Sequence, residues 1–465
     1  MSQAPSNFLA TLEQLGQSEL AAHWQSLPAA AQTELQQQLA TIDLAELQTL
    51  YARRDEPYSP PARDRIAPLP TEPEPIDPVV IARGEAALKA GEVAVLVVAG
   101  GQGTRLGFDK PKGMFPVSPI RQATLFQLHA EKVVALSNRY KKTIPFLVMT
   151  SSATHADTEA YFAEQNYFGL PPTSVRFFQQ GTLPTLDLAT GKLLLERPGV
   201  VFSSPNGHGG TLKALADSGL LDELMHQGIR HLYYFQVDNP LVRIADPAFL
   251  GLHLQTQAEV SVKVIEKQQP REKMGVFALI DQRCSIIEYS DLPDDLAELR
   301  DADGRLSYRA GNPAIHLFDL AFLKRITADA GSLPVHLARK KVPYWDPATG
   351  QTVNPTQENA LKFEMFIFDA LPLANRWLAV ETDRALEFAP LKNATGADSP
   401  QTVQQAISDL YAHWLAQSGV SIPRDESGHV RVPIEIAAGY ALDAAELQSK
   451  LPSGFALTEA PCRLE

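Results

Sequence analysis

The chain has 465 residues, of which 45% are hydrophobic and 20% are charged, a balance typical of a folded protein with a substantial core and more than one unit. A formal net charge of -13 argues against nucleic acid or an anionic membrane as the main partner, since either would need a broad basic surface. Cys284 and Cys462 fit neither a zinc site nor a disulfide framework, so a cytoplasmic location is expected.

Residues 1–56 predict a small N-terminal helical unit. Apolar side chains recur there at intervals of three and four, which places them on one face of a helix. The segment lacks the basic start and apolar run of a secretory signal. No apolar run in the sequence approaches the roughly 20 residues needed to cross a bilayer. The apolar positions include Phe8, Leu12, Leu15, Leu20, Trp24, Leu35 and Leu39.

Residues 57–79 predict an extended connector. Proline lacks a backbone N–H and fixes φ, so closely spaced prolines prevent both helix and sheet. The prolines of this segment include Pro60, Pro61, Pro68, Pro70, Pro73 and Pro75.

Residues 80–404 predict an α/β domain with a Rossmann-like, mostly parallel central sheet. Short apolar runs alternate with helical stretches, and continuous apolar runs are typical of strands buried on both faces. Residues 405–465 predict a small C-terminal α+β lobe, with a helix over 403–417 and a strand-and-turn region near 430–438. The expected strands of the central sheet lie at 93–98, 145–149, 175–178, 232–237 and 260–265.

A glycine-rich loop follows the first of these strands. Its glycines allow backbone N–H groups to approach phosphate oxygens, while Arg105 and Lys112 supply positive charge. The lysine does not close a Walker loop, and Leu106 stands where the dinucleotide fingerprint needs glycine. For the glycines alone, a turn that serves only geometry is the alternative. The loop residues expected to bind a nucleotide are Ala99, Gly100, Gly101, Gln102, Gly103 and Thr104.

The loop and several later segments resemble the UDP-N-acetylhexosamine pyrophosphorylases and their relatives, the UDP-sugar and UDP-glucose pyrophosphorylases. The resemblance runs from about residue 90 to about residue 415, in the order of the family. Beyond the loop, it is carried by Phe177 to Gly181, Asn206 to Gly210, Tyr234 to Asn239, Ile287 to Ser290, Ala310 to Asn312, Leu361 to Asp369 and Pro390 to Asn393.

This resemblance implies an enzyme of nucleotidyltransferase fold that joins UTP and a sugar 1-phosphate. It implies catalytic roles for Arg105, Lys112 and Lys392. Phe366 and Phe368 are expected to alternate on a strand and so to share one face, with core packing as the default alternative. The implied nucleotide contacts are Gln180, Gly207, His208, Asp238 and Lys362, and the implied sugar contacts are Glu288, Tyr289, Asn312, Phe366 and Phe368.

The implied chemistry is transfer between two phosphorylated substrates. The sugar phosphate is already an anion, so it can attack the α-phosphorus of UTP without a general base, and pyrophosphate leaves. Cations and a metal must offset the repulsion between the substrates. Asp238, expected at the carboxyl end of a strand, is the candidate ligand of Mg²⁺, with capping of a turn as the alternative. Arg105, Lys112, Asp238 and Lys392 should therefore converge.

Because of His208, the resemblance does not decide which sugar 1-phosphate is the substrate. In the N-acetylhexosamine branch the second glycine turn typically reads Asp-Gly-Asn-Gly-Gly, and the UDP-glucose branch typically carries Gly-His-Gly, as Gly207 to Gly209 do here. The first loop is closer to the N-acetylhexosamine branch, so N-acetylglucosamine 1-phosphate is the expected substrate. Glucose 1-phosphate, or a broad range of sugar phosphates, is the first alternative. A UDP-sugar-binding protein without turnover is the alternative from another class.

Overall fold

The structure, a computed structural model, describes residues 4–56, 61–328 and 333–465. Its contacts divide the chain into two compact units. Unit 1 comprises Met1–Ser59, Gln180–Thr211 and Leu333–Ile367, and unit 2 comprises Pro60–Gln179, Leu212–Ser332 and Phe368–Glu465. The four-part division expected from the sequence stays a prediction. The expectation that 57–79 contains no sheet is wrong, because residues 66–68 pair with residues 278–280 as an edge strand, the place in a sheet where proline is tolerated. Positions 1–3 of its helical unit and 57–60 of its connector, Pro60 included, lie outside the described residues.

Unit 1 packs N-terminal helices against small antiparallel sheets. Buried Leu35 and Leu39 of the third helix share a core with Leu186 and Leu361 from the sheets. Asp43 starts the fourth helix by accepting a hydrogen bond from Glu46 N, as a capping carboxylate does. The elements are α1 (Ala4–Gln14), α2 (Ser18–Ser26), α3 (Ala29–Ala40), α4 (Leu44–Ala52), β5 (Thr182–Pro184), β6 (Leu186–Asp187), β7 (Leu195–Arg197), β8 (Val200–Val201), β9 (Ser203–Pro205), β16 (His336–Lys340), β17 (Tyr344–Asp346), β18 (Gln351–Val353) and β19 (Ala360–Glu364).

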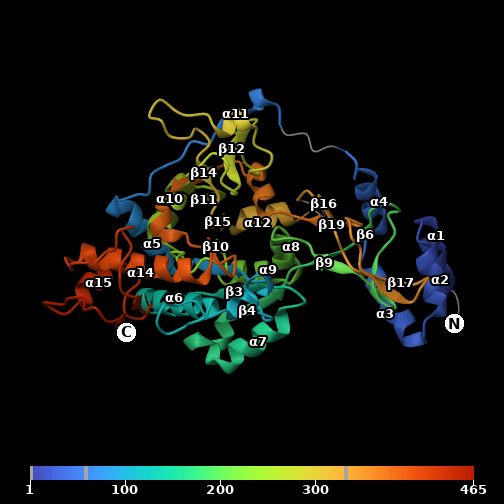
Figure 1. The fold of residues 1–465 in the computed structure, drawn as a ribbon, viewed down its shortest axis with the longest axis horizontal. Helices are drawn as coiled ribbons and strands as arrows, with labels where there is room; N and C mark the ends of the chain where they lie inside the picture. The colour runs from blue at the N-terminus through green and yellow to red at the C-terminus, as the bar shows by residue number, and fades with distance from the viewer. Residues whose placement is uncertain (1–3, 57–60, 329–332) are drawn as a thin grey trace. The chain divides into compact units, whose positions relative to one another are not determined.

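Unit 2 is built on one large mixed sheet (Figure 1). Its parallel centre confirms the α/β class. β15, and the strands on the far side of β11 in the order below, pair antiparallel with their neighbours. The strand order is β1 (Ile66–Pro68), β12 (Val276–Ile280), β14 (Ala310–Gly311), β11 (Val260–Glu266), β15 (His316–Asp319), β10 (His231–Gln236), β2 (Val93–Val98), β3 (Phe146–Thr150) and β4 (Val175–Gln179), with β13 (Arg283–Ile287) paired to β12 and β20 (Trp377–Glu381) paired to β11.

The directions of the strands bring several strand ends to one side of the sheet. β10, β2, β3 and β4 pair in parallel. β15 is antiparallel to both β10 and β11, so β11 runs in the same direction as β10, and β20 is parallel to β11. The carboxyl ends of these six strands therefore lie along one edge, called here the carboxyl edge. Ligands of open α/β sheets bind at such an edge.

Helices cover the sheet and bury its apolar strands. Val95, Val97, Phe146 and Phe235 are fully buried, and burying each such side chain stabilises the fold by about 1.5–3 kcal/mol. The helices of unit 2 are α5 (Pro78–Ala90), α6 (Leu125–Tyr140), α7 (His155–Glu164), α9 (Leu220–His226), α10 (Pro247–Thr256), α11 (Asp294–Ala297), α12 (Leu320–Thr327), α13 (Arg384–Glu387), α14 (Pro400–Gln417) and α15 (Ala444–Lys450). α8 (Gly210–Asp217) begins in unit 1 and continues in unit 2, and the 3₁₀ turns are η1 (Arg63–Arg65), η2 (Thr104–Leu106), η3 (Lys112–Met114), η4 (Asn166–Gly169), η5 (Pro172–Ser174) and η6 (Ile367–Leu373).

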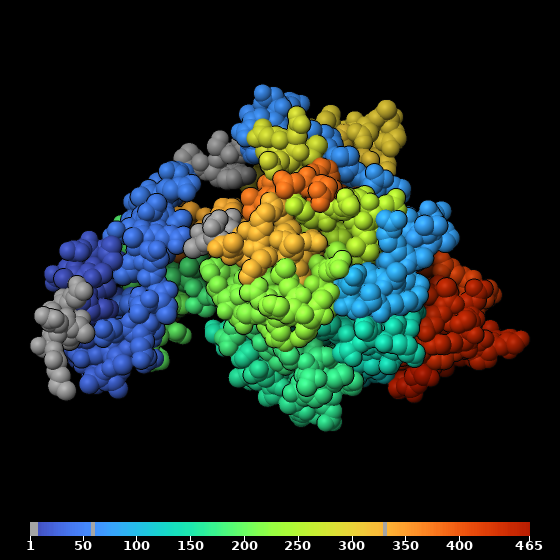
Figure 2. All heavy atoms as spheres, turned by 180° about the vertical axis from the view of Figure 1, so that it is seen from behind, coloured from blue at the N-terminus to red at the C-terminus, as the bar shows by residue number. Residues whose placement is uncertain are grey.

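Within unit 2, the C-terminal residues have an apolar cluster of their own. They include α15 and the parallel pair β21 (Ile434–Ile436) and β22 (Cys462–Leu464). Arg139 of α6 binds Asp443 and Glu446 at the start of α15, and the space-filling view shows red C-terminal residues beside cyan residues (Figure 2). Among the described residues, no helix combines the length and the apolar character that a membrane span requires.

Candidate active site

The glycine-rich loop lies at the carboxyl edge, directly after β2. Its two halves are joined by backbone hydrogen bonds from Gly103 N to Lys110 O and from Lys112 N to Gly101 O, each 3.0 Å long. Ser151, which follows β3, donates a hydrogen bond to Gly100 O at 2.8 Å. The loop is thus a closed turn that holds Ala99 to Thr104 and places Lys112 near its own start.

Lys112 and Asp238 meet at this edge. The Lys112 Nζ lies 3.0 Å from Asp238 Oδ2, and the two side chains are 18% and 14% exposed, so both remain accessible to a ligand. The segment that carries Lys392 joins them, because Leu391 N donates to Asp238 O at 2.8 Å. Arg105 lies on η2 of the same loop and is exposed. The structure therefore brings Lys112, Asp238 and the Lys392 segment together, with Arg105 on the loop beside them.

Two basic residues of α6 hold the turn after β10. The His129 Nε2 donates to Val237 O at 2.9 Å, and Lys132 Nζ donates to Val242 O at 2.9 Å and to Pro240 O at 2.5 Å. Burial, with the charge of Lys132 added, lowers the pKa of His129 to about 3, so the imidazole is neutral at pH 7. Burial lowers the pKa of Lys132 to about 8. Both residues were missed in the sequence. They could have been noticed as polar side chains among the apolar positions of the helix over 125–140.

A metal at this edge would depend on Asp238. Among the described residues, no group of three or more His, Cys, Asp or Glu side chains could hold an ion by itself. A single hard carboxylate still fits Mg²⁺, which is commonly bound through one or two carboxylates together with substrate phosphates. The residues present are thus compatible with a metal that arrives with a nucleotide.

Glu288 and Asn312, the candidate sugar contacts, are brought together by Gly275. Asn312 N donates to Gly275 O at 3.0 Å. A Cβ built on Gly275 would lie 3.3 Å from Glu288 Oε1. Asn312 Oδ1 also accepts from Ala314 N at 2.8 Å, so part of its role is to cap a turn. Tyr289 is 46% exposed.

In unit 1, the second glycine turn packs on the residues after β19. Gly207 has φ +82°, and a Cβ there would lie 2.4 Å from Met365 O. Met365 N donates to Asn206 O, and Gly209 N donates to Met365 O, both at 2.8 Å. Asn206 N in turn donates to Gly181 O at 3.0 Å, next to the nearly buried Gln180. The nucleotide candidates Gln180 and Gly207 therefore belong to one backbone assembly.

His208 belongs to the same assembly. Its Nδ1 accepts a hydrogen bond from Ile367 N at 3.1 Å, which requires that nitrogen to be unprotonated. Its ring centroid lies 5.5 Å from that of Phe366. Lys362 lies on β19, with its ammonium 5.6 Å from the Phe202 ring centroid, and burial lowers its pKa.

The expectation that Phe366 and Phe368 share a strand is wrong. β19 ends at Glu364, and Phe368 lies in η6. The ladder stops there because the backbone of Met365 pairs with Asn206 and Gly209 instead of continuing along β16. The apolar alternation of the segment gave no sign of this distant pairing.

The chain resembles known proteins over most of its length. A family model described as UTP–glucose-1-phosphate uridylyltransferase matches residues 64–416. A UDP-N-acetylglucosamine pyrophosphorylase from Saccharomyces cerevisiae is 40% identical over 348 residues, 73% of each chain. A human UDP-N-acetylhexosamine pyrophosphorylase-like protein 1 is 37% identical over 433 residues, 88% of this chain and 85% of the relative. The solved UDP-N-acetylglucosamine pyrophosphorylase of Trypanosoma brucei, 26% identical, superposes with a TM-score of 0.82 over 100% of this chain and 99% of its own.

Proposed function

The chain belongs to the UTP–glucose-1-phosphate uridylyltransferase family, and we propose that it joins UTP to N-acetylglucosamine 1-phosphate, giving UDP-N-acetylglucosamine and pyrophosphate. Membership of the family makes it an enzyme that transfers a uridylyl group to a sugar 1-phosphate. The choice of N-acetylglucosamine rests on relatives of that name, which are 35–40% identical to this chain.

The observation that carries the site assignment is the Lys112–Asp238 pair at the carboxyl edge. A phosphoryl group bound beside the glycine-rich loop would meet backbone N–H groups, the Lys112 ammonium and the exposed Arg105. The loop is closed by its own hydrogen bonds, so its donors need little rearrangement when charge develops. We assign Arg105 and Lys112 to the triphosphate. We assign Lys392 to phosphate groups of the substrates that lie on the side of its own segment.

The proposed reaction is an in-line displacement. A phosphate oxygen of the sugar 1-phosphate attacks the α-phosphorus of UTP, the bond from that phosphorus to the β-phosphate oxygen breaks, and pyrophosphate leaves. The nucleophile carries its charge already, so the chain supplies orientation and cations in place of a general base.

We propose Mg²⁺ as the metal and Asp238 as its protein ligand. When bound, the ion would neutralise part of the charge of the phosphates. The Lys112 ammonium, 3.0 Å from Asp238 Oδ2, would then turn from the carboxylate toward the phosphates of the nucleotide. A cytoplasmic location stays a prediction from the cysteine pattern.

We assign Gln180, Gly207 and His208 to the nucleotide, and Glu288, Asn312 and Tyr289 to the sugar. Support for the first assignment is the cradle formed where the turn around Gly207 meets Met365 without a side chain between them. Support for the second is that Asn312 N donates to Gly275 O, while the Glu288 carboxylate lies where a Cβ of residue 275 would meet it. Lys362, Phe366 and Phe368 are assigned to the substrates by the family resemblance alone.

The test is a pyrophosphate-release assay with UTP, Mg²⁺ and a panel of sugar phosphates. We expect N-acetylglucosamine 1-phosphate to give the highest kcat/KM, by at least about tenfold, the discrimination available to one well-placed polar contact. Glucose 1-phosphate is the second candidate, favoured by His208 in the second glycine turn. A higher kcat/KM for glucose 1-phosphate would select it. Tight UDP-sugar binding with neither pyrophosphate release in the forward direction nor pyrophosphorolysis of the UDP-sugar would instead indicate a binding protein.

A further inference from the structure

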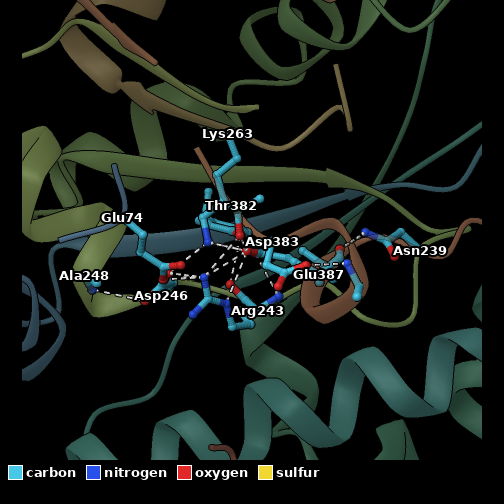
Figure 3. Close-up of polar contacts among 12 residues, drawn as sticks. Glu74, Asn239, Arg243, Asp246, Ala248, Lys263, Thr382, Asp383 and Glu387 are labelled. Carbon is cyan, nitrogen blue, oxygen red and sulfur yellow. Dashed lines mark hydrogen bonds and ion pairs between the residues drawn. The ribbon is translucent and has the colours of Figure 1, made fainter. Parts of the chain in front are cut away.

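A cluster of charged side chains, buried at its centre, joins several segments of unit 2 (Figure 3). The Lys263 ammonium lies 2.6 Å from Glu387 Oε2 and 2.8 Å from Asp246 Oδ2. Arg243 Nη2 lies 3.0 Å from the same Glu387 oxygen. The cluster comprises Glu74, Arg243, Asp246, Lys263, Thr382 and Glu387.

Glu387 is the centre of this charge cluster. Its side chain is 0% exposed, and Thr382 Oγ1 donates to it at 2.7 Å. Burial opposes its ionisation, but the charges of Lys263 and Arg243 outweigh that effect and lower its pKa. Removing one partner of a buried charge pair is strongly destabilising, because the other charge is left without compensation. Glu387 is therefore held in one position.

The backbone after Glu387 is fastened to the end of β10. Asn239 Nδ2 donates to Glu387 O at 2.8 Å, and Asn239 Oδ1 accepts from Ala389 N at 3.1 Å. Two residues further, Leu391 N donates to Asp238 O at 2.8 Å. Asn239 is only 3% exposed. The chain from Glu387 to Leu391 is thus hydrogen-bonded to Asp238 and Asn239 at three points, and the next residue is Lys392.

We propose that Asn239, held on Glu387 by the charge cluster, is a positioning residue that sets Lys392 against Asp238 and Lys112. The inference rests on the proposed function for the role of Lys392. An ammonium at the end of a long side chain reaches a phosphate correctly only if its backbone is fixed. A misplacement of about 1 Å in such a group can reduce a rate about 100-fold. Asn239 touches no substrate in this proposal and acts through Lys392.

A merely structural role for Asn239 predicts a different pattern. In that case the loss of Asn239 would lower stability, and Lys392→Ala would reduce kcat by the same factor with or without Asn239. Positioning predicts that losing Asn239 and losing Lys392 have overlapping effects, since both remove the same contact with a phosphate. A double-mutant cycle separates the two cases, because independent effects multiply whereas overlapping effects do not.

The experiment compares wild type, Asn239→Ala, Lys392→Ala and the double variant. Two quantities are measured: kcat for pyrophosphate release, and the Kd for UTP by calorimetry, which needs no turnover. We expect Asn239→Ala to lower kcat about 10- to 100-fold in the wild-type background and less than about threefold in the Lys392→Ala background. Asn239→Asp keeps the acceptor for Ala389 N but puts a carboxylate oxygen against Glu387 O and adds a buried charge, so its kcat should fall at least as far as that of Asn239→Ala.

Asn359→Ala is the matched control. Asn359 makes the same kind of paired contact, accepting from Val342 N at 2.9 Å and donating to Val342 O at 3.0 Å, and it belongs to unit 1. It should lose stability while its kcat stays within about threefold of wild type. Two results would overturn the inference. One is a decrease in kcat for the double variant equal to the product of the decreases for the two single variants. The other is a kcat for Asn239→Ala as high as that of Asn359→Ala.

The failure of the proposed function would look different. A wild-type chain that binds UTP and releases no pyrophosphate would contradict the proposed function. The same double-mutant cycle, measured as the Kd for UTP, would still show whether Asn239 acts through Lys392. Overlapping losses of UTP affinity in Asn239→Ala and Lys392→Ala would support positioning even then, and multiplying losses would overturn it.

Discussion

Lys112 donates a hydrogen bond to Asp238 at 3.0 Å, although 126 residues separate them along the chain. One belongs to the glycine-rich loop after β2 and the other follows β10, the neighbouring parallel strand. The pair is only partly exposed, with side-chain exposures of 18% and 14%. A cation and a carboxylate therefore lie together at the edge where open α/β sheets bind ligands, and we propose that each exchanges its partner for a phosphate or a metal.

We predict that Lys112→Ala reduces kcat far more than it weakens binding of the UDP-sugar. The lysine is assigned to charge that develops during transfer, and losing one such donor typically lowers kcat about 10²–10³-fold. Steady-state kinetics and calorimetry with UDP-N-acetylglucosamine measure the two effects. Lys324→Ala, which removes the lysine of the exposed Lys324–Asp222 pair, is the control and should change neither. Equal losses in kcat and affinity for Lys112→Ala would contradict the assignment.

Asp238→Asn should weaken the response of the enzyme to Mg²⁺. The amide keeps an oxygen for Lys112 but loses the negative charge that a hard cation requires. A titration of kcat against Mg²⁺ should show the half-saturating concentration rising at least about tenfold, the size of effect typical of losing a ligand contact. Asp222→Asn, in the pair with Lys324, provides the comparison. An unchanged titration curve would remove Asp238 from the metal site.

Gly207→Ala should weaken UTP binding as well as the fold. The φ of +82° strains an alanine, and its Cβ would meet Met365 O at 2.4 Å, so the assembly that carries His208 must shift. Gly350→Ala is a matched control in the same unit, with φ +69° and nothing within 4 Å of a Cβ. Both variants should lose about 1–2 kcal/mol of stability from the positive φ. Calorimetry should show a Kd for UTP raised at least about tenfold for Gly207→Ala and unchanged for Gly350→Ala.

His129 should make the protein sensitive to acid. Its pKa is about 3 in the folded chain and 6.5 when exposed, the decrease arising from burial and then from Lys132. The unfolded chain therefore binds more protons between these values, so stability falls as the pH falls from 6.5 toward 3. One such group accounts for a loss of about 2 kcal/mol between pH 7 and pH 5.

The measurement for His129 is urea unfolding at several pH values. His129→Gln keeps a donor for Val237 O and cannot titrate, so its stability should fall about 2 kcal/mol less than that of wild type between pH 7 and pH 5. His253 is also buried, with a pKa of about 3, so some acid sensitivity should persist in the variant. Parallel curves for wild type and His129→Gln would show that His129 is not the titrating group.

The large sheet was predictable because its strands are buried on both faces. Runs such as Val93–Val98 must be apolar throughout, and a continuous apolar run is visible in the sequence alone. The same rule placed Asp238 correctly at a strand end. The grouping of 180–211 and 333–367 with the N-terminal helices was not predictable, because it depends on short antiparallel pairs such as β16 with β19 and on apolar contacts between distant segments.

The charge cluster was hidden for a similar reason. Lys263 lies within an apolar strand, where a lone lysine in the sequence reads as an interruption, and its partners Asp246 and Glu387 come from elements that only the fold brings near. Asn239 was part of a recognised motif, but its contact with Glu387 spans 148 residues. Sequence patterns report local periodicity and motifs, whereas polar contacts between remote segments need coordinates.

The most direct test of the account is a crystal structure with UDP-N-acetylglucosamine and Mg²⁺ bound. We predict that the diphosphate lies at the carboxyl edge of unit 2, within hydrogen-bond distance of the glycine-rich loop and beside Lys392, with the metal on Asp238. A nucleotide sugar bound elsewhere, with the Lys112–Asp238 hydrogen bond intact and no phosphate near either side chain, would contradict it.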